Sequence, residues 1–232
     1  EPLNTGMLAL NRVVHPPYLE AWERGETGYP LVDASMKCLN ATGYLNFRMR
    51  AMLVTFASFG LWLPYQALGR HMARVFLDFE PGIHYGQFQM QCGLTGYHPM
   101  RVYNPVRQAR EYAPEGIFVK QWLPGLKDVP TALLYEPWKM TEMEQNFYNC
   151  KIGRDYPAPL LDYEEEVRQN KLRYWEVRMT EAVEEALPAI WERDCLPLNA
   201  AEYRANWEVA REQRARNRAQ EKASPDGFRR GI

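Results

Sequence analysis

Proline and glycine divide this chain into segments whose apolar residues recur every three or four positions. After Pro30, the side chains of Val32, Met36 and Leu39 follow that spacing, and Gly43 is placed to end a helix. Proline suits the first turn of a helix and glycine suits its end. No segment shows the alternation of apolar and polar residues that is typical of a strand. We therefore expect an all-α fold.

The same spacing predicts other helices in the following places: residues 48–63, 66–77, 86–91, from 163 onward and 206–222. Pro81 and Gly82 are expected to break the chain before the helix at 86–91. The segment 93–137 is rich in proline and glycine, so we expect loops with short helices, one of them within 115–124. Large aromatic side chains favour the core, and we expect this of Trp122, Trp138 and Trp175.

Composition favours one soluble globular unit. The chain has 232 residues, 46% of them hydrophobic, which is enough for a substantial core. It contains no apolar run long enough for a membrane span, and its first residues do not resemble a secretory signal. Four cysteines lie far apart without a CxxC pair, which argues against a zinc ribbon or a disulfide framework: Cys38, Cys92, Cys150 and Cys195. We expect reduced thiols and a reducing compartment, either cytoplasm or an organellar stroma or matrix.

Charge is unevenly distributed along the chain. The net charge is −1, which does not indicate a general nucleic-acid binder. Residues 160–203 carry 11 acidic and 5 basic side chains, whereas residues 204–232 carry 8 basic and 4 acidic ones. The basic end is interpreted as a solvated helix, with contact to an acidic partner or nucleic acid as the alternative.

Four short blocks carry the most specific signal in the sequence. They are Trp22–Ala34 (WERGETGYPLVDA), Thr42–Arg50 (TGYLNFRMR), Leu77–Glu80 (LDFE) and Arg101–Pro105 (RVYNP). In order and spacing they resemble the helical FAD-binding domain of photolyases and cryptochromes. The resemblance extends from about Leu19 to Arg178 and implies the C-terminal part of that domain, without the antenna domain. We accordingly divide the chain into a partial FAD-binding domain at 1–178 and a helical, basic tail at 179–232.

The resemblance implies five residues in contact with FAD. In the family, an arginine pairs with an aspartate beside the flavin ring, and Arg50 and Asp78 stand at those places. Phe47 replaces an amide that would contact the cofactor, and Glu80 replaces a second aspartate. His84 lines up with the residue that faces flavin N5, where it could form a hydrogen bond with N5 or titrate near neutral pH. The alternatives are an ordinary interhelical ion pair for Arg50 and Asp78, and a loop or helix-cap role for His84.

Residues that the family uses for photoreduction are replaced. The three tryptophans of its electron-transfer chain fall at Phe88, Tyr65 and Arg12, so we expect that chain to be broken. A different route through Trp62, Tyr85 or Trp22 stays open.

Residues that the family uses for DNA are only partly retained. The tryptophan that packs against a flipped lesion falls at Met90, which removes a stacking platform. Arg48 and Arg101 match basic residues near the DNA-binding face, so we expect at most weak contact with nucleic acid.

The loop that holds the flavin phosphates in the family has no counterpart in this sequence. The resemblance therefore implies other phosphate partners, namely Arg70, Arg74 or Lys120, or a second chain. We expect a homo-oligomer or a protein partner to cover the missing half of the cavity. His84, Cys92 and His98 match no common metal-site spacing, so we expect no metal, and we assign no catalytic residue.

Two classes of function remain, with a third behind them. The first is an FAD-binding protein that acts as a blue-light or redox flavoprotein without ordinary DNA repair. The second is a cofactor-free scaffold or complex subunit that uses the fold for protein interaction. The third is an enzyme, a deoxyribodipyrimidine photolyase-like lyase, and we rank it last.

Overall fold

The computed structural model describes residues 2–98, 100–194 and 197–223. Within these ranges the chain is helical, with an isolated β-bridge between Ile152 and Tyr156. The all-α prediction is confirmed. In chain order the elements are η1 (Thr5–Leu10), α1 (Pro16–Arg24), α2 (Pro30–Thr42), α3 (Phe47–Thr55), the π-helix η2 (Phe56–Gly60), α4 (Tyr65–Val75), α5 (Pro81–Gln91), α6 (Pro105–Tyr112), α7 (Ile117–Trp122), η3 (Pro124–Leu126), α8 (Thr131–Leu134), η4 (Pro137–Lys139), α9 (Glu142–Phe147), α10 (Tyr163–Arg178), α11 (Glu181–Asp194) and α12 (Pro197–Ala223).

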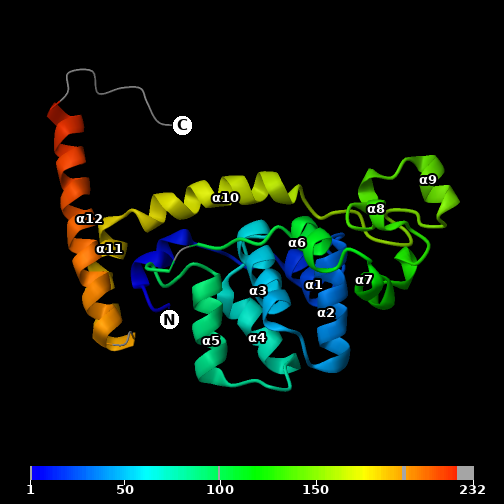
Figure 1. The fold of residues 1–232 in the computed structure, drawn as a ribbon, viewed down its shortest axis with the longest axis horizontal. Helices are drawn as coiled ribbons and strands as arrows, with labels where there is room; N and C mark the ends of the chain where they lie inside the picture. The colour runs from blue at the N-terminus through cyan, green and yellow to red at the C-terminus, as the bar shows by residue number, and fades with distance from the viewer. Residues whose placement is uncertain (1, 99, 195–196, 224–232) are drawn as a thin grey trace.

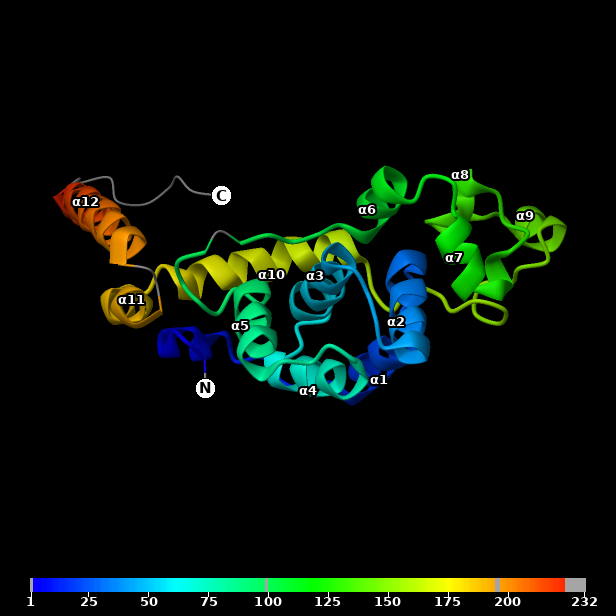
Figure 2. The ribbon, with the colours of Figure 1, turned by 60° about the horizontal axis from the view of Figure 1, so that its bottom comes forward.

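Helix α10 runs along one side of the molecule and connects its two ends (Figure 1). The short helices α7 to α9 lie at one end, and α11 and α12 lie at the other. Helix α10 packs on η1 and η2, while α7 packs on α2. The helices α3, α4 and α5 lie between the two ends, and α5 packs against both of the others (Figure 2). Elements from both halves of the chain therefore support the central helices.

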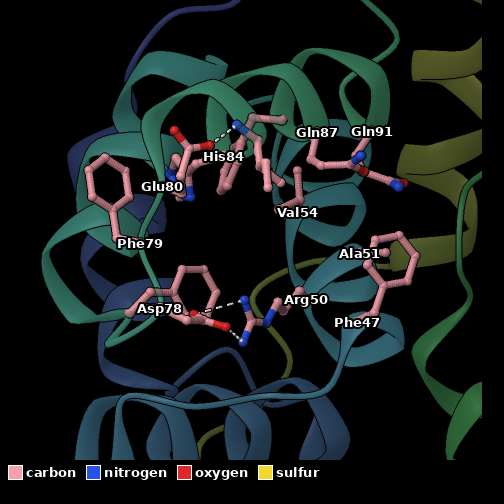
Figure 3. A pocket seen from close by; sticks show the side chains of 13 residues that line it. Phe47, Arg50, Ala51, Val54, Asp78, Phe79, Glu80, His84, Gln87 and Gln91 are labelled. Carbon is pink, nitrogen blue, oxygen red and sulfur yellow. Dashed lines mark hydrogen bonds and ion pairs between the residues drawn. The ribbon is translucent and has the colours of Figure 1, made fainter.

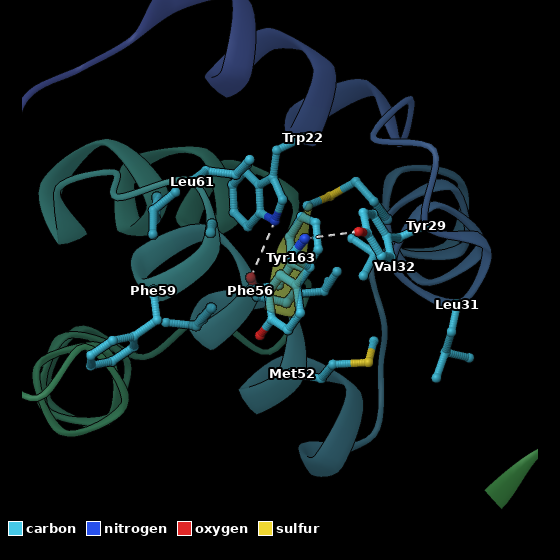
Figure 4. Packing of buried hydrophobic residues seen from close by; sticks show 14 of the residues in the cluster. Trp22, Tyr29, Leu31, Val32, Met52, Phe56, Phe59, Leu61 and Tyr163 are labelled. Atoms are coloured by element: carbon cyan, nitrogen blue, oxygen red, sulfur yellow. Dashed lines mark hydrogen bonds between the residues drawn. The ribbon is translucent and has the colours of Figure 1, made fainter. Parts of the chain in front are cut away.

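Aromatic side chains join α10 to the centre of the fold (Figure 4). The rings of Phe56 and Tyr163 stack with centroids 4.9 Å apart and an interplanar angle of 10°. The hydroxyl of Tyr29 accepts a hydrogen bond from the Tyr163 amide at 3.1 Å. Trp22, which is fully buried, donates from Nε1 to the carbonyl of Leu53 on α3 at 3.2 Å. Because aromatic side chains bury large areas, these contacts hold α3 in a defined position.

A buried carboxylate fixes the start of α2. Asp33 is fully buried and accepts hydrogen bonds from the amide and hydroxyl of Thr27 at 2.8 and 2.6 Å. It also accepts from the Gly28 amide at 3.0 Å and from the Tyr156 hydroxyl at 2.6 Å. Burial raises the pKa of Asp33 to about 6, and the hydrogen bonds from Thr27, Tyr156 and Gly28 oppose that rise. This network attaches the segment around Tyr156 to the turn before α2.

The predicted helix at 48–63 is helical as far as Gly60, but it is not a single α-helix and it ends three residues earlier than predicted. Helix α3 ends at Thr55 and continues as the π-helix η2, which ends at Gly60. Gly60 at the end of this π-helix lies against Tyr163, since a Cβ there would sit 2.6 Å from the Tyr163 ring. After this wide turn, Trp62 has a φ of 54°, a strained conformation for a bulky residue.

The predicted chain break at Pro81 and Gly82 is also wrong, because α5 begins at Pro81. Proline at the first helical position costs no hydrogen bond, and the side chain of Glu80 caps the helix before it. Trp122 and Trp138 are half-buried and pack against the core as predicted. The prediction for Trp175 is wrong, since that side chain is 47% exposed.

The segment after α10 forms two helices at one end of the molecule. Helix α11 packs on η1, where Val183 is buried and its carbonyl accepts a hydrogen bond from Asn4 Nδ2 at 3.0 Å. Helix α12 packs on α11, and the rings of Trp191 and Trp207 meet with centroids 6.0 Å apart. It begins nine residues before the predicted start at 206.

The described residues include three of the four cysteines. Cys38, Cys92 and Cys150 are free thiols, and the prediction for Cys195 lies outside the described residues. Among the helices that the structure describes, none has both the length and the apolar character needed to cross a membrane.

Candidate functional site

A cavity of about 270 Å³ opens between α3, α5 and the segment that precedes α5 (Figure 3). All five predicted cofactor-contacting residues lie on its wall, although they come from separate parts of the sequence. Figure 3 shows Arg50 and Asp78 on one side and Glu80 and His84 across from them. The complete lining is Phe47, Arg50, Ala51, Val54, Phe76, Asp78, Phe79, Glu80, Ile83, His84, Gln87, Phe88 and Gln91.

Helical spacing explains how two segments supply most of this wall. The α3 members follow an i, i+3, i+4, i+7 pattern from Phe47 to Val54, and four of the five α5 members follow the same pattern from His84 to Gln91. Residues at those positions share one face of a helix. The sequence interpretation missed Gln87 and Gln91 because it began the helix at residue 86. A helix started at Pro81 would have placed both beside His84.

Arg50 and Asp78 form a bidentate ion pair at the cavity wall. Arg50 Nη1 and Nη2 donate to the two carboxylate oxygens at 3.1 and 2.8 Å. Nε of Arg50 donates to the carbonyl of Leu45 at 2.6 Å, and the guanidinium lies 4.2 Å from the ring centroid of Phe76. The hydrogen bonds from Arg50 hold the pKa of Asp78 below its usual range. The guanidinium is therefore fixed in orientation, and Asp78 is ionised at neutral pH.

His84 is buried on the opposite wall as a neutral ring. Its Nε2 lies 2.9 Å from the carbonyl of Gly69, and because a carbonyl can only accept, Nε2 carries the proton. Phe79 and Phe88 enclose the ring, with centroids 5.0 and 4.5 Å away. Burial lowers the pKa of His84, and the hydrogen bond to Gly69 only partly opposes this shift. Nδ1 is then the acceptor nitrogen of this histidine.

Glu80 and Phe47 lie at the mouth of the cavity. The carboxylate of Glu80 accepts from the amides of Gly82 and Ile83 at 3.1 and 2.6 Å. These bonds lower the pKa of Glu80, so the group is ionised at neutral pH. Phe47 is 61% exposed and also lines a neighbouring hollow that contains Arg48. The mouth is therefore apolar on one side and negatively charged on the other.

Comparison with known proteins shows the family of the chain. A family model described as the FAD binding domain of DNA photolyase matches residues 5–176. The chain belongs to this family. That the match corresponds to the C-terminal part of the photolyase fold stays a prediction.

Similar proteins include both photolyases and cryptochromes. A deoxyribodipyrimidine photo-lyase of Alkalihalophilus pseudofirmus is 34% identical over 147 residues, covering 62% of this chain and 31% of that protein. The cryptochrome DASH of Gloeobacter violaceus is 34% identical over 170 residues, covering 69% of this chain and 34% of that protein. The chain thus spans about a third of the length of the curated relatives it matches.

Solved structures give the same fold. A cryptochrome of Synechocystis sp. PCC6803 superposes with a TM-score of 0.66 and 28% identity, over 68% of this chain and 33% of that one. An archaeal photolyase from Sulfolobus tokodaii, whose structure contains two FAD molecules, gives a TM-score of 0.66 and 30% identity over 76% of this chain and 39% of that one.

The residues predicted to face DNA lie away from the cavity of this photolyase-type domain. Arg48 stacks 4.0 Å from the ring centroid of Tyr112 in the neighbouring hollow. Arg101 is exposed in the segment before α6, and Met90 is half-buried on α5. None of these three predicted residues lines the cavity.

The positions of the photolyase tryptophans are occupied by buried groups. Phe88 lines the cavity, and Tyr65 is buried at the start of α4. Arg12 donates to the carbonyl of Cys92 at 2.8 Å, and its guanidinium lies 4.5 Å from the ring of Trp62. Because a neighbouring cation makes loss of an electron harder, this contact disfavours Trp62 as an electron donor. Tyr85 and Trp22 stay as the other open routes.

No group of three or more histidine, cysteine, aspartate or glutamate side chains gathers around a metal-sized position in the described ranges. Of the three residues considered from sequence, His84 binds Gly69, and His98 Nδ1 lies 3.2 Å from the hydroxyl of Thr95. Cys92 is buried beside Arg12, and burial raises its thiol pKa to about 11.

Replacing His84 with asparagine is expected to reduce the pH dependence of stability. Because burial lowers the pKa of His84, the unfolded chain takes up this proton more readily than the folded protein. The stability that the neutral ring contributes is therefore present above a pH of about 6.5 and is lost as the pH falls. Urea unfolding between about pH 7.5 and 5.5 would measure this loss, which should be smaller in His84→Asn.

His98→Asn provides a reference for this measurement. His98 lies outside the cavity wall, and burial lowers its pKa as well. Because the pKa shift has the same sign, this variant should also reduce the pH dependence of the free energy of unfolding. Equal slopes for the wild type and His84→Asn would contradict the assignment of a buried neutral ring.

Proposed function

We propose that this chain is a flavin-binding domain that serves a blue-light or redox flavoprotein without ordinary DNA repair activity. The observation that carries the proposal is the meeting of Arg50, Asp78 and His84 on the wall of one cavity, in a chain of the photolyase family. FAD is the cofactor that the family implies. A bound flavin would supply blue-light absorption and electron-transfer chemistry.

The chain's own residues have separate roles in this proposal. Arg50 would stabilise negative charge on the flavin ring, and Asp78 holds the guanidinium in place through two hydrogen bonds. His84 presents a neutral ring that packs against Phe79 and Phe88. Glu80 and Phe47 would contact the ligand at the mouth.

DNA repair is the weakest of the candidate functions. The relatives named photo-lyases are about three times as long as the part matched here, so their activity does not transfer to this chain. Met90 lacks the aromatic face that a flipped base would stack on, while Arg48 and Arg101 support only contact with phosphates. We propose no lyase activity for this domain.

A protein-interaction role is favoured by the apolar mouth of the cavity. Ile83 and Phe47 line the cavity and are 67% and 61% exposed. Exposed apolar side chains around a cavity are typical of a surface that another protein covers. We propose that a second copy of the chain or another protein packs on this mouth. A cofactor-free scaffold would use the same surface, so the presence of flavin separates the two functions.

Two further proposals concern the whole chain. The free thiols of Cys38, Cys92 and Cys150 support a reducing compartment, such as cytoplasm, stroma or matrix. The division into an FAD-binding domain at 1–178 and a helical tail at 179–232 stays a prediction, supported by the end of α10 at Arg178.

An absorption spectrum of the protein purified from its native source tests the proposed function. We expect flavin bands, and heat release should yield about one flavin per protein assembly that contains the cavity. A colourless protein that also fails to bind added flavin would contradict the proposal and favour the scaffold. His84→Asn in the coloured protein should shift its spectrum, because His84 lines the cavity.

A further inference from the structure

We propose that this cavity recognises the flavin ring but not the diphosphate of FAD, so that riboflavin, FMN and FAD bind the chain with similar affinity. The inference rests on the proposed flavin-binding function and specifies which part of the ligand the site selects. The charges of the wall, the start of α5 and the size of the cavity support it.

The charges on the cavity wall disfavour an anionic ligand group. Among the 13 lining residues Arg50 is the only lysine or arginine, and both its terminal nitrogens already donate to Asp78. Glu80 adds a second ionised carboxylate. With His84 neutral, the wall carries one more negative than positive charge, and a phosphate group carries about −1.5 to −2. A flavin phosphate would therefore be repelled at this wall.

The start of α5 is already occupied by a carboxylate of the chain. A helix N-terminus offers free amides and a positive dipole end, which together form a natural phosphate site. Here the amides of Gly82 and Ile83 donate to Glu80 at 3.1 and 2.6 Å. A phosphate could bind these amides only by displacing Glu80, so the helix end adds no affinity for FAD over riboflavin.

Size and the position of other cations lead to the same conclusion. The volume of about 270 Å³ lies below the roughly 300–1,000 Å³ of pockets that enclose drug-sized ligands. A cavity of this size does not enclose the whole of FAD, so part of that ligand would extend beyond the wall. Arg70 lines a separate hollow with Tyr65 and Tyr85. Arg74 and Lys120 are likewise absent from the cavity lining.

Titration of the full 232-residue chain with three flavins tests this inference. Quenching of flavin fluorescence would give the Kd of riboflavin, FMN and FAD at about 50 and about 500 mM NaCl. We expect the three Kd values to agree within about threefold, with riboflavin no weaker than FMN. High salt should reduce any deficit of FMN, because it screens repulsion between phosphate and the wall.

A charge-removing variant at the mouth sharpens the test. Glu80→Gln keeps a carbonyl that can cap α5 but removes the negative charge, so FMN should gain about twofold relative to riboflavin. Glu144→Gln is the matched control, because Glu144 is also a helix-capping carboxylate and lies on α9, outside the cavity lining. It should leave the FMN to riboflavin ratio unchanged.

Different outcomes separate this inference from the function on which it rests. Binding of FMN or FAD tenfold or more tighter than riboflavin, or weakening of the phosphate-bearing flavins by salt, would overturn ring-only recognition while supporting a flavin site. A Glu80→Gln variant in which FMN loses affinity relative to riboflavin would do the same. Absence of binding by all three flavins would overturn the proposed function itself, and ring recognition with it.

Discussion

Replacing Arg50 with methionine is expected to weaken flavin binding by about 100-fold, which corresponds to about 2.7 kcal/mol. The guanidinium lies on the cavity wall, and Asp78 and Leu45 fix its orientation. The guanidinium can still stack on the ring and attract negative charge that develops there, and a desolvated contact of this kind contributes about 2 kcal/mol or more. The variant also leaves Asp78 as an unpaired negative charge beside the ligand. Flavin fluorescence titration of the wild type and the variant measures the change.

The loss of binding should not reflect loss of the fold. Asp78 is 53% exposed on its side chain, so breaking the ion pair should lower the free energy of unfolding by about 1 kcal/mol or less. Arg168→Met is the matched control, because Arg168 makes a similar bidentate pair with Glu165 on α10. It should bind flavin as the wild type does. Unchanged binding by Arg50→Met would show that Arg50 and Asp78 are an interhelical ion pair without a ligand role.

Replacing Asp33 with asparagine is expected to lower the free energy of unfolding by about 3 kcal/mol at pH 7. The carboxylate accepts four hydrogen bonds in a fully buried position. Each carboxylate oxygen of Asp33 accepts two of these bonds, and an asparagine replaces one oxygen with an NH2 group that cannot accept. Two of the four donor groups would then lose their acceptor in a buried position. Urea unfolding followed by far-UV circular dichroism measures the loss.

Two reference variants and the pH dependence show whether the loss of stability comes from this hydrogen-bond network or from a nonspecific effect of the substitution. Tyr156→Phe removes one of the four donors and should cost about 1 kcal/mol, while Asp128→Asn at an exposed position should cost almost nothing. Because burial raises the pKa of Asp33 to about 6, the folded protein takes up this proton at a pH where the unfolded chain does not. The wild type should therefore gain stability relative to Asp33→Asn as the pH falls from 7 toward 5, by at most about 1.4 kcal/mol per pH unit. A constant difference across that range would contradict the raised pKa.

Local signals in the sequence were sufficient for the helices that proline and glycine delimit. Pro30 and Gly43 marked α2 correctly, because both act through local backbone geometry. The π-helix η2 and the positive φ of Trp62 have no such local marker, and the close approach of Tyr163 to Gly60 joins residues about a hundred positions apart. The same holds for the bond between Asp33 and Tyr156, which are 123 residues apart.

The sequence predicted the charged and titratable residues of the candidate site but not all the residues that line the cavity. Resemblance to the photolyase motifs led to Arg50, Asp78 and His84, which the fold brings to one cavity. The capping role of Glu80 was not expected, because it depends on a helix that begins at Pro81 rather than at residue 86. Whether these residues contact a flavin stays a prediction, and the titrations above decide it.

The projection of α12 affects how the size of this protein in solution should be measured. A helix of 27 residues is about 40 Å long, and Figure 1 shows α12 extending past α10 at one end of the molecule. Such an outline raises hydrodynamic drag, so the 27.2 kDa chain should elute from a gel-filtration column earlier than a sphere of equal mass. An early elution volume would therefore resemble that of a dimer even for a single copy. Light scattering, which reports mass independently of shape, is the appropriate measurement of whether copies of this chain associate.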